Sequence, residues 1–139
     1  MQASPLLGPV VALVAWSILM LFWTATVRAQ VLRGREIPNG ARGADLEGRA
    51  PGKVLWPSHN YTHLMEQPTL FYAIVFALVL MDFDAPINVW LAWGYVAFRI
   101  VHSLLQATVN IVRIRLLLFA AATLCLIGLT THAALRLIG

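Results

Sequence analysis

The sequence has little charge and almost no cysteine. Only 12% of its 139 residues are charged, about half the share of an ordinary soluble domain, while 60% are apolar and the mean hydropathy is +0.76. This balance excludes a typical soluble enzyme and a disordered chain. The single cysteine, Cys125, lies in an apolar run, so neither a disulfide framework nor a cysteine metal cluster is available. The length fits one small membrane domain.

Charge is missing from whole stretches of the chain, and these stretches mark candidate membrane spans. A transmembrane helix needs about 20 predominantly apolar residues. Residues 1–27 carry no charged side chain, although a cleaved signal peptide remains an alternative there. The last apolar stretch covers about 50 residues. As a single helix it would be more than twice as long as the bilayer core is thick, so the chain must turn near 108–115. We therefore predict one domain, residues 1–139, with spans at about 5–30, 57–81, 86–108 and 113–137.

The segment at about 33–55 has the opposite composition. It is rich in glycine and in basic residues and shows no helical or alternating period, which predicts a flexible polar loop. A phosphate-binding loop would need GxxxxGK[ST] after a strand, and the segment has neither. The fold class predicted from these patterns is an all-α integral membrane protein, with four transmembrane helices in an antiparallel bundle.

The basic residues also predict an orientation. Eight of the ten lie on the side of the first and third loops, and Arg136 is the one on the opposite side. Because cytoplasmic loops carry an excess of Lys and Arg, we expect these two loops to be cytoplasmic, with both termini outside, in a bacterial inner membrane. The basic balance then reflects topology and does not indicate nucleic-acid binding.

Ionisable side chains inside a span are costly and are therefore functional candidates. In the second span, His59, His63 and Glu66 fall within about 60° of one helix face, and Asn60 lies beside it. Pro68 removes a backbone donor one turn into the span, which leaves a carbonyl free and permits a kink.

The third span carries a second polar stripe. Arg99, His102, Gln106 and Asn110 lie within about 80° of one another, so we expect the stripe to face protein or a watery cleft. Three other interpretations stay open. Glu66 and Arg99 could form an internal ion pair, Arg113 and Arg115 could be interfacial anchors, and His59, His63, Glu66 and His102 could hold a metal, although no metal is expected.

Several of these residues form motifs that resemble the MAPEG family, membrane-associated proteins in eicosanoid and glutathione metabolism. The motifs are Asn-x5-Glu-x-Pro-x2-Phe-Tyr in the second span and Arg-x2-His-x10-Arg at the junction of the third and fourth spans, at Asn60, Glu66, Pro68, Phe71, Tyr72, Arg99, His102 and Arg113. The resemblance covers nearly the whole chain. It implies a homotrimer surrounded by membrane lipids. Small residues in the spans, such as Gly94, permit close approach of helices.

The resemblance also implies a glutathione site in a cytoplasm-facing cleft between subunits. By this resemblance, Arg113 would stabilise the thiolate of glutathione. The residues that would bind glutathione are Arg28, Asn60, Glu66, Arg99, His102 and Gln106. Arginines suit the two carboxylates of glutathione, and a guanidinium lowers the pKa of a nearby thiol. A small lipophilic electrophile or hydroperoxide would reach the thiol from the lipid side.

The chain departs from the eicosanoid branch of that family at three places. Trp56 stands where an arginine is expected, Asn60 and Glu66 are six residues apart instead of three, and His102 and Gln106 replace tyrosines. These departures indicate a divergent, bacterial branch. Two functions remain: a glutathione- or thiol-dependent transferase or peroxidase, and a non-catalytic membrane scaffold or accessory protein in which the polar stripe only joins helices.

Overall fold

The computed structural model describes residues 3–34, 39 and 52–139. The helices in these residues are α1 (Leu7–Leu32), α2 (Gly52–Leu64), α3 (Pro68–Leu80), α4 (Pro86–Thr108) and α5 (Val112–Ile138). Most of the loop expected at about 33–55 lies outside the described residues, but α2 begins at Gly52, inside that range. The chain is an all-helical bundle.

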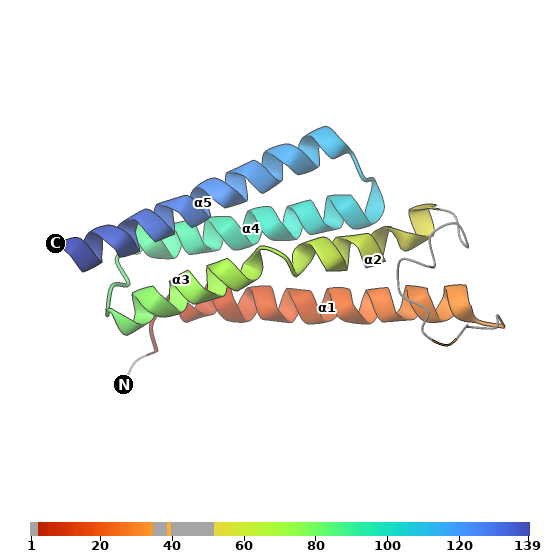
Figure 1. Cartoon of the computed structure of the whole chain (residues 1–139), viewed down its shortest axis with the longest axis horizontal. Helices are drawn as coiled ribbons and strands as arrows, with labels where there is room; N and C mark the ends of the chain where they lie inside the picture. The colour runs from red at the N-terminus through yellow and green to blue at the C-terminus, as the bar shows by residue number, and fades with distance from the viewer. Residues whose placement is uncertain (1–2, 35–38, 40–51) are drawn as a thin grey trace.

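The helices run along one long axis, and the chain reverses direction at each connection except the one between α2 and α3 (Figure 1). Both termini and the turn between α3 and α4 lie at one end, which we call the terminal end. The turn between α4 and α5 lies at the other, the loop end, where Val31 of α1 packs with Leu55 of α2. The result is an up-and-down antiparallel arrangement, in which α4 packs against α1, α2 and α5.

The second apolar segment is broken between α2 and α3. Pro68 is the first residue of α3 and has no N–H, so it cannot donate to the carbonyl of Leu64, where α2 ends. The two helices still follow one another along one line in Figure 1. The helix is therefore interrupted just before Pro68, and the carbonyl of Leu64 has no backbone donor among the described residues.

The turns at the two ends use residues with left-handed backbone angles. Asp82 ends the α3 region with φ 50°, and Asn110 ends the α4 region with φ 56°. Asp and Asn tolerate this conformation better than other non-glycine residues because their short polar side chains bond locally. Asn110 was expected on the polar stripe of the third span, and the structure places it in the turn to α5.

Glycines let α4 and α5 approach closely. A Cβ atom added at Gly128 would lie 3.1 Å from Leu91 Cδ1, and one added at Gly94 would lie 3.3 Å from Cys125 Sγ. Small residues at a helix crossing allow such contacts in membrane proteins. Gly94, which the sequence marked as a close-approach position, therefore serves packing inside the protomer.

The apolar core lies in the terminal half of the bundle. Phe71 of α3 stacks on Tyr95 of α4, with ring centroids 4.4 Å apart, and both side chains are fully buried. Leu13 of α1 and Leu129 of α5 are fully buried in the same cluster. Helices α1, α3, α4 and α5 thus contribute side chains to one core.

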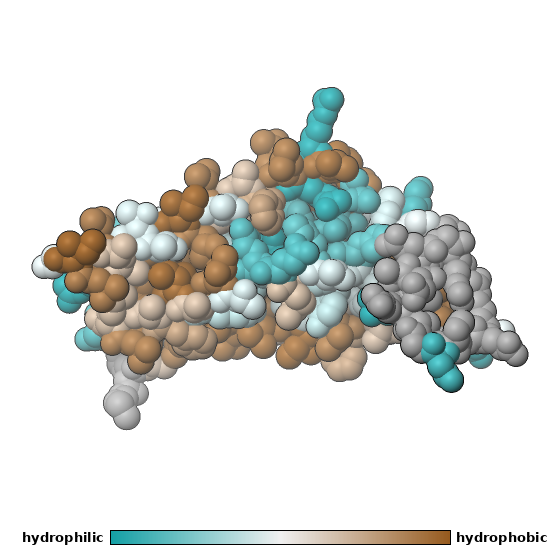
Figure 2. Space-filling model, in the orientation of Figure 1, coloured by the Kyte–Doolittle hydropathy of each residue, from teal (hydrophilic) through white to brown (hydrophobic). Residues whose placement is uncertain are grey.

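Three segments in the described residues are long and apolar enough to cross a membrane: Leu7–Leu32, Gly52–Leu80 and Val112–Ile138. Helix α4 is 23 residues long and carries the buried polar stripe, which lowers its hydropathy. Large apolar side chains such as Phe22 and Leu124 are more than 60% exposed on the outer surface, and apolar atoms cover much of the face in Figure 2. A surface of this kind is suited to lipid.

Candidate functional site

Buried polar side chains gather in the loop half of the bundle, between α2 and α4. Each is at most 5% exposed, and together they form the polar cluster: Asn60, Arg99, His102, Ser103 and Gln106. Figure 2 shows the hydrophilic surface beginning near the middle of the molecule and continuing toward the loop end. Four of the five were candidates on sequence grounds, and the fold brings them together because α2 and α4 pack side by side.

Arg99 occupies the break between α2 and α3. Its Nη2 atom donates to the carbonyls of His63 at 3.1 Å and of Leu64 at 3.3 Å. The Leu64 carbonyl has no helical donor because Pro68 lacks an N–H, and within the described residues the His63 carbonyl otherwise accepts only a long bond of 3.4 Å from the N–H of Glu66. The arginine therefore satisfies the backbone at the kink, a role that the sequence did not predict.

The rest of the Arg99 guanidinium is unsatisfied. Its side chain is 1% exposed, and its Nε and Nη1 atoms find no hydrogen-bond partner in the part of the chain that the structure describes. A buried cation without an anion is costly. The ion pair between Glu66 and Arg99 that the sequence left open is not formed, because Glu66 bonds instead to His63.

Two acceptors of the polar cluster are also unsatisfied. Asn60 donates through Nδ2 to Ser103 Oγ at 2.7 Å, which fixes the amide and leaves its Oδ1 atom without a partner among the described residues. Gln106 Oε1 is likewise buried without a hydrogen-bond partner in the described part of the chain. Buried polar atoms are normally hydrogen-bonded, so this region presents both donors and acceptors to a polar ligand or to ordered water.

His63 and His102 meet on one side of the polar cluster. Their ring centroids are 5.2 Å apart, and the His63 ring also lies 5.4 Å from the ring of Phe119 on α5. His63 Nδ1 lies 3.0 Å from Glu66 Oε2. Glu66 itself is largely exposed, with a side-chain exposure of 65%. No motif in the sequence marked Phe119, and only the packing of α5 on α4 places it here.

Arg28 lies at the edge of the site, between α1 and α2. Its Nε and Nη2 atoms donate to Ser58 Oγ at 2.9 and 2.6 Å. Thr24, one turn earlier on α1, donates to the carbonyl of Pro57 at 2.9 Å. Arg28, a candidate from the sequence, thus lies beside α2, whereas Ser58 and Thr24 carry no sequence signal that would select them.

The two arginines at the start of α5 point differently. Arg113 is exposed. Arg115 is partly buried and donates from Nη1 to Asn110 Oδ1. Because Arg115 precedes Phe119 by four residues, both lie on the face of α5 that is directed at the polar cluster. Within one protomer Arg115 therefore approaches the site, and Arg113 lies on the outer surface.

The residues considered for a metal do not converge. Within residues 3–34, 39 and 52–139, no three His, Cys, Asp or Glu side chains lie close enough to hold a metal ion. Glu66 approaches His63, and His63 approaches His102, but no third ligand completes a site. The metal interpretation has no support in this part of the molecule.

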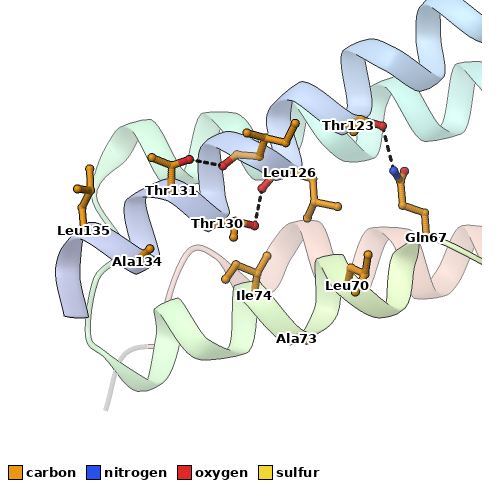
Figure 3. Close-up of a pocket in the computed structure, with 11 residues that line it drawn as sticks. Gln67, Leu70, Ala73, Ile74, Thr123, Leu126, Thr130, Thr131, Ala134 and Leu135 are labelled. Atoms are coloured by element: carbon orange, nitrogen blue, oxygen red, sulfur yellow. Dashed lines mark hydrogen bonds between the residues drawn. The ribbon is translucent and has the colours of Figure 1, made fainter. Parts of the chain in front are cut away.

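A groove runs along the bundle between α3 and α5, toward the terminal end (Figure 3). Its volume is about 840 Å³, within the range of pockets that hold small organic ligands. Apolar side chains such as Leu70, Ile74 and Leu126 line it. Its polar end is Gln67, which donates to Thr123 Oγ1 at 3.0 Å and directly follows Glu66. The groove thus begins at the break between α2 and α3.

The comparison with protein families gives one result. The model described as MAPEG family matches residues 6–135. The chain belongs to the MAPEG family. No curated protein and no solved structure matched it. This MAPEG chain is therefore a membrane protein with a helical bundle, and the resemblance noted from its motifs is confirmed.

Proposed function

We propose that this MAPEG protein binds glutathione at the polar cluster and joins the glutathione sulfur to lipophilic substrates, or uses glutathione to reduce lipophilic hydroperoxides. The observation that carries the proposal is the state of Arg99: a fully buried guanidinium with two nitrogens unpaired, in the same cluster as the unpaired oxygens of Asn60 and Gln106. Glutathione offers carboxylates to the Arg99 guanidinium and amide N–H groups to the oxygens of Asn60 and Gln106, so one ligand would satisfy both the donors and the acceptors.

The lipophilic substrate would arrive through the groove between α3 and α5. The groove is largely apolar, with threonines along α5, and has its amide end at Gln67, one residue from Glu66. An acyl chain or a ring system in this groove would leave its reactive carbon near the thiol of glutathione. Bringing two reactants together in this way accounts for a large part of enzymatic rate enhancement.

We further propose that the protein is a homotrimer with four membrane spans per protomer. Helix α4 is 23 residues long, about 34 Å at 1.5 Å per residue, enough to cross the hydrocarbon core. The excess of basic residues would place the loop end in the cytoplasm. Arg113, exposed on one protomer, would then face a neighbouring subunit and complete its site near the thiolate.

A membrane scaffold without catalysis is the second candidate. The contact that favours it is the pair of bonds from Arg99 Nη2 to the carbonyls of His63 and Leu64, because this contact holds α4 to the break between α2 and α3 whether or not a ligand binds. Under this alternative, the remaining polar atoms would be satisfied by water.

Calorimetry on the purified, detergent-solubilised protein tests the proposal. We expect the wild type to bind glutathione at millimolar concentration or tighter, and we expect Arg99→Met and Arg113→Ala to bind at least tenfold more weakly. The matched control is Arg136→Ala, an arginine on α5 near the terminal end. No binding by the wild type at millimolar glutathione would reject the proposal and favour the scaffold.

A further inference from the structure

His63 and Glu66 form an oriented imidazole–carboxylate pair at the break between α2 and α3. The Nδ1 and Oε2 atoms are 3.0 Å apart. A carboxylate can only accept, so Nδ1 carries the proton in this contact, and the other ring nitrogen of a neutral His63, Nε2, is a free base. A carboxylate that fixes the tautomer of a histidine is the arrangement that general-base catalysis uses.

The surroundings hold the His63 ring in place. The rings of His102 on α4 and Phe119 on α5 lie 5.2 and 5.4 Å from it, and its own carbonyl accepts a bond from Arg99. Its side chain is nevertheless 30% exposed. The ring is thus fixed by three elements and can still be reached by a ligand.

The charged and titratable groups around His63 are mostly basic. They are Glu66 from the break, His59 from the preceding turn of α2, Arg99 and His102 from α4, and Arg115 from the face of α5 that carries Phe119. The arginines among them favour an anion in this region. A proton acceptor surrounded by cations is suited to generating and holding a thiolate.

We propose that His63, oriented by Glu66, is the general base that takes the proton of the glutathione thiol. The inference rests on the proposed function, since it names the group that activates the ligand assigned there. The S–H bond breaks with its electron pair remaining on sulfur, and the proton forms a new bond to His63 Nε2. The thiolate then attacks the electrophilic carbon of the lipophilic substrate, and the imidazolium returns its proton to the leaving group or to the carbanion formed.

The test measures glutathione bound to the full-length protein in detergent. Thiolate is followed by its ultraviolet absorbance as pH is raised, and glutathione affinity is measured separately by calorimetry. In the wild type we expect bound thiolate well below the pKa of a free thiol, about 8.5. In His63→Gln we expect thiolate to appear only near that value, with affinity changed less than threefold, and turnover to fall about 10²- to 10⁴-fold.

Two further variants keep the test independent of folding. Glu66→Gln changes a side chain that is 65% exposed, so the bundle should fold, and we expect a smaller shift in the same direction. His59→Gln is the matched control, an exposed histidine one turn earlier on α2, and should leave the thiolate titration unchanged.

The outcomes separate the two proposals. A thiolate titration that is the same in wild type, His63→Gln and Glu66→Gln, with glutathione still bound, would overturn the role of His63 while leaving the proposed function intact. Failure of the wild type to bind glutathione would overturn both. A titration shifted equally by His59→Gln would also overturn the inference, because the effect would then be one of general charge.

Discussion

The two halves of the bundle are held together by different contacts. In the terminal half, fully buried apolar side chains such as Phe71, Val75 and Leu129 fill the space between helices. In the loop half, α2 and α4 meet through Asn60, Arg99 and Ser103. Apolar side chains have no hydrogen-bonding atoms to satisfy, whereas the buried polar residues Asn60 and Arg99 leave an acceptor and two donors unpaired among the described residues. The terminal half is therefore held mainly by apolar packing, and the loop half keeps polar atoms available to a ligand or to water.

The largest expected effect is in the terminal half. Phe71→Ala removes a fully buried ring that stacks on Tyr95, and we expect the free energy of unfolding in detergent to fall by about 3–5 kcal/mol because a cavity remains. Phe76→Ala is the control, since that phenylalanine of α3 is 47% exposed. Equal losses in the two variants would mean that the terminal half is not held by packing.

The next effect concerns the loop half and its ligand. Glutathione at 100 times its Kd should raise the free energy of unfolding by about 2.7 kcal/mol, because a ligand that binds only the folded state stabilises it by mass action. Phe71→Ala should keep this increment, and Arg99→Met should lose it. Thermal unfolding with and without glutathione measures both. If glutathione still raises the free energy of unfolding of Arg99→Met by the same amount, it binds at another site.

A smaller effect is expected from Ser103→Ala. The substitution leaves Asn60 Nδ2 without the acceptor that it now has at 2.7 Å, and an unsatisfied buried donor costs about 1–3 kcal/mol. The control is Thr108→Ala, because that exposed hydroxyl donates to the carbonyl of Leu104 in its own helix. If both hydroxyls prove equally dispensable, then hydrogen bonding between α2 and α4 does not hold the loop half together.

The smallest effect is expected where α1 meets α2. Thr24→Val keeps the shape of the side chain but removes the bond from its hydroxyl to the Pro57 carbonyl, and we expect a loss of about 0.5–1.5 kcal/mol. Thr26→Val is matched to it, since Thr26 is exposed and bonds to Phe22 in its own helix. Chemical denaturation of the two variants measures the difference in their free energies of unfolding. If there is no difference, the bond from Thr24 to Pro57 does not stabilise the contact between α1 and α2.

The sequence predicted the helical membrane class and the family because both depend on local patterns. Runs of apolar residues and the spacing of Asn60, Glu66, Arg99 and Arg113 can be seen without any coordinates. The helical face of α4 also placed Arg99, His102 and Gln106 together, since residues three or four apart share a side. The glutathione site and the trimer stay predictions, as neither depends on one protomer alone.

Other features depended on which helices became neighbours. Nothing in the sequence pairs Arg28 with Ser58 or places Phe119 against His63 and His102, because these contacts join residues on different helices that only tertiary packing brings together. The partner of Arg99 was also unpredictable: the choice between Glu66 and the carbonyls of the kink is decided by distances across the bundle. Sequence spacing carries no information about such distances.

The scarcity of charge by itself determined that this chain is a membrane bundle and that its few internal polar residues matter. Tertiary structure alone decided how these residues are used: Arg99 satisfies the broken helix with one nitrogen and leaves two unpaired, and Glu66 turns to His63. The physical reason is that burial in an apolar bundle is a property of the sequence, whereas hydrogen-bond partners are fixed only when helices meet at definite distances and angles.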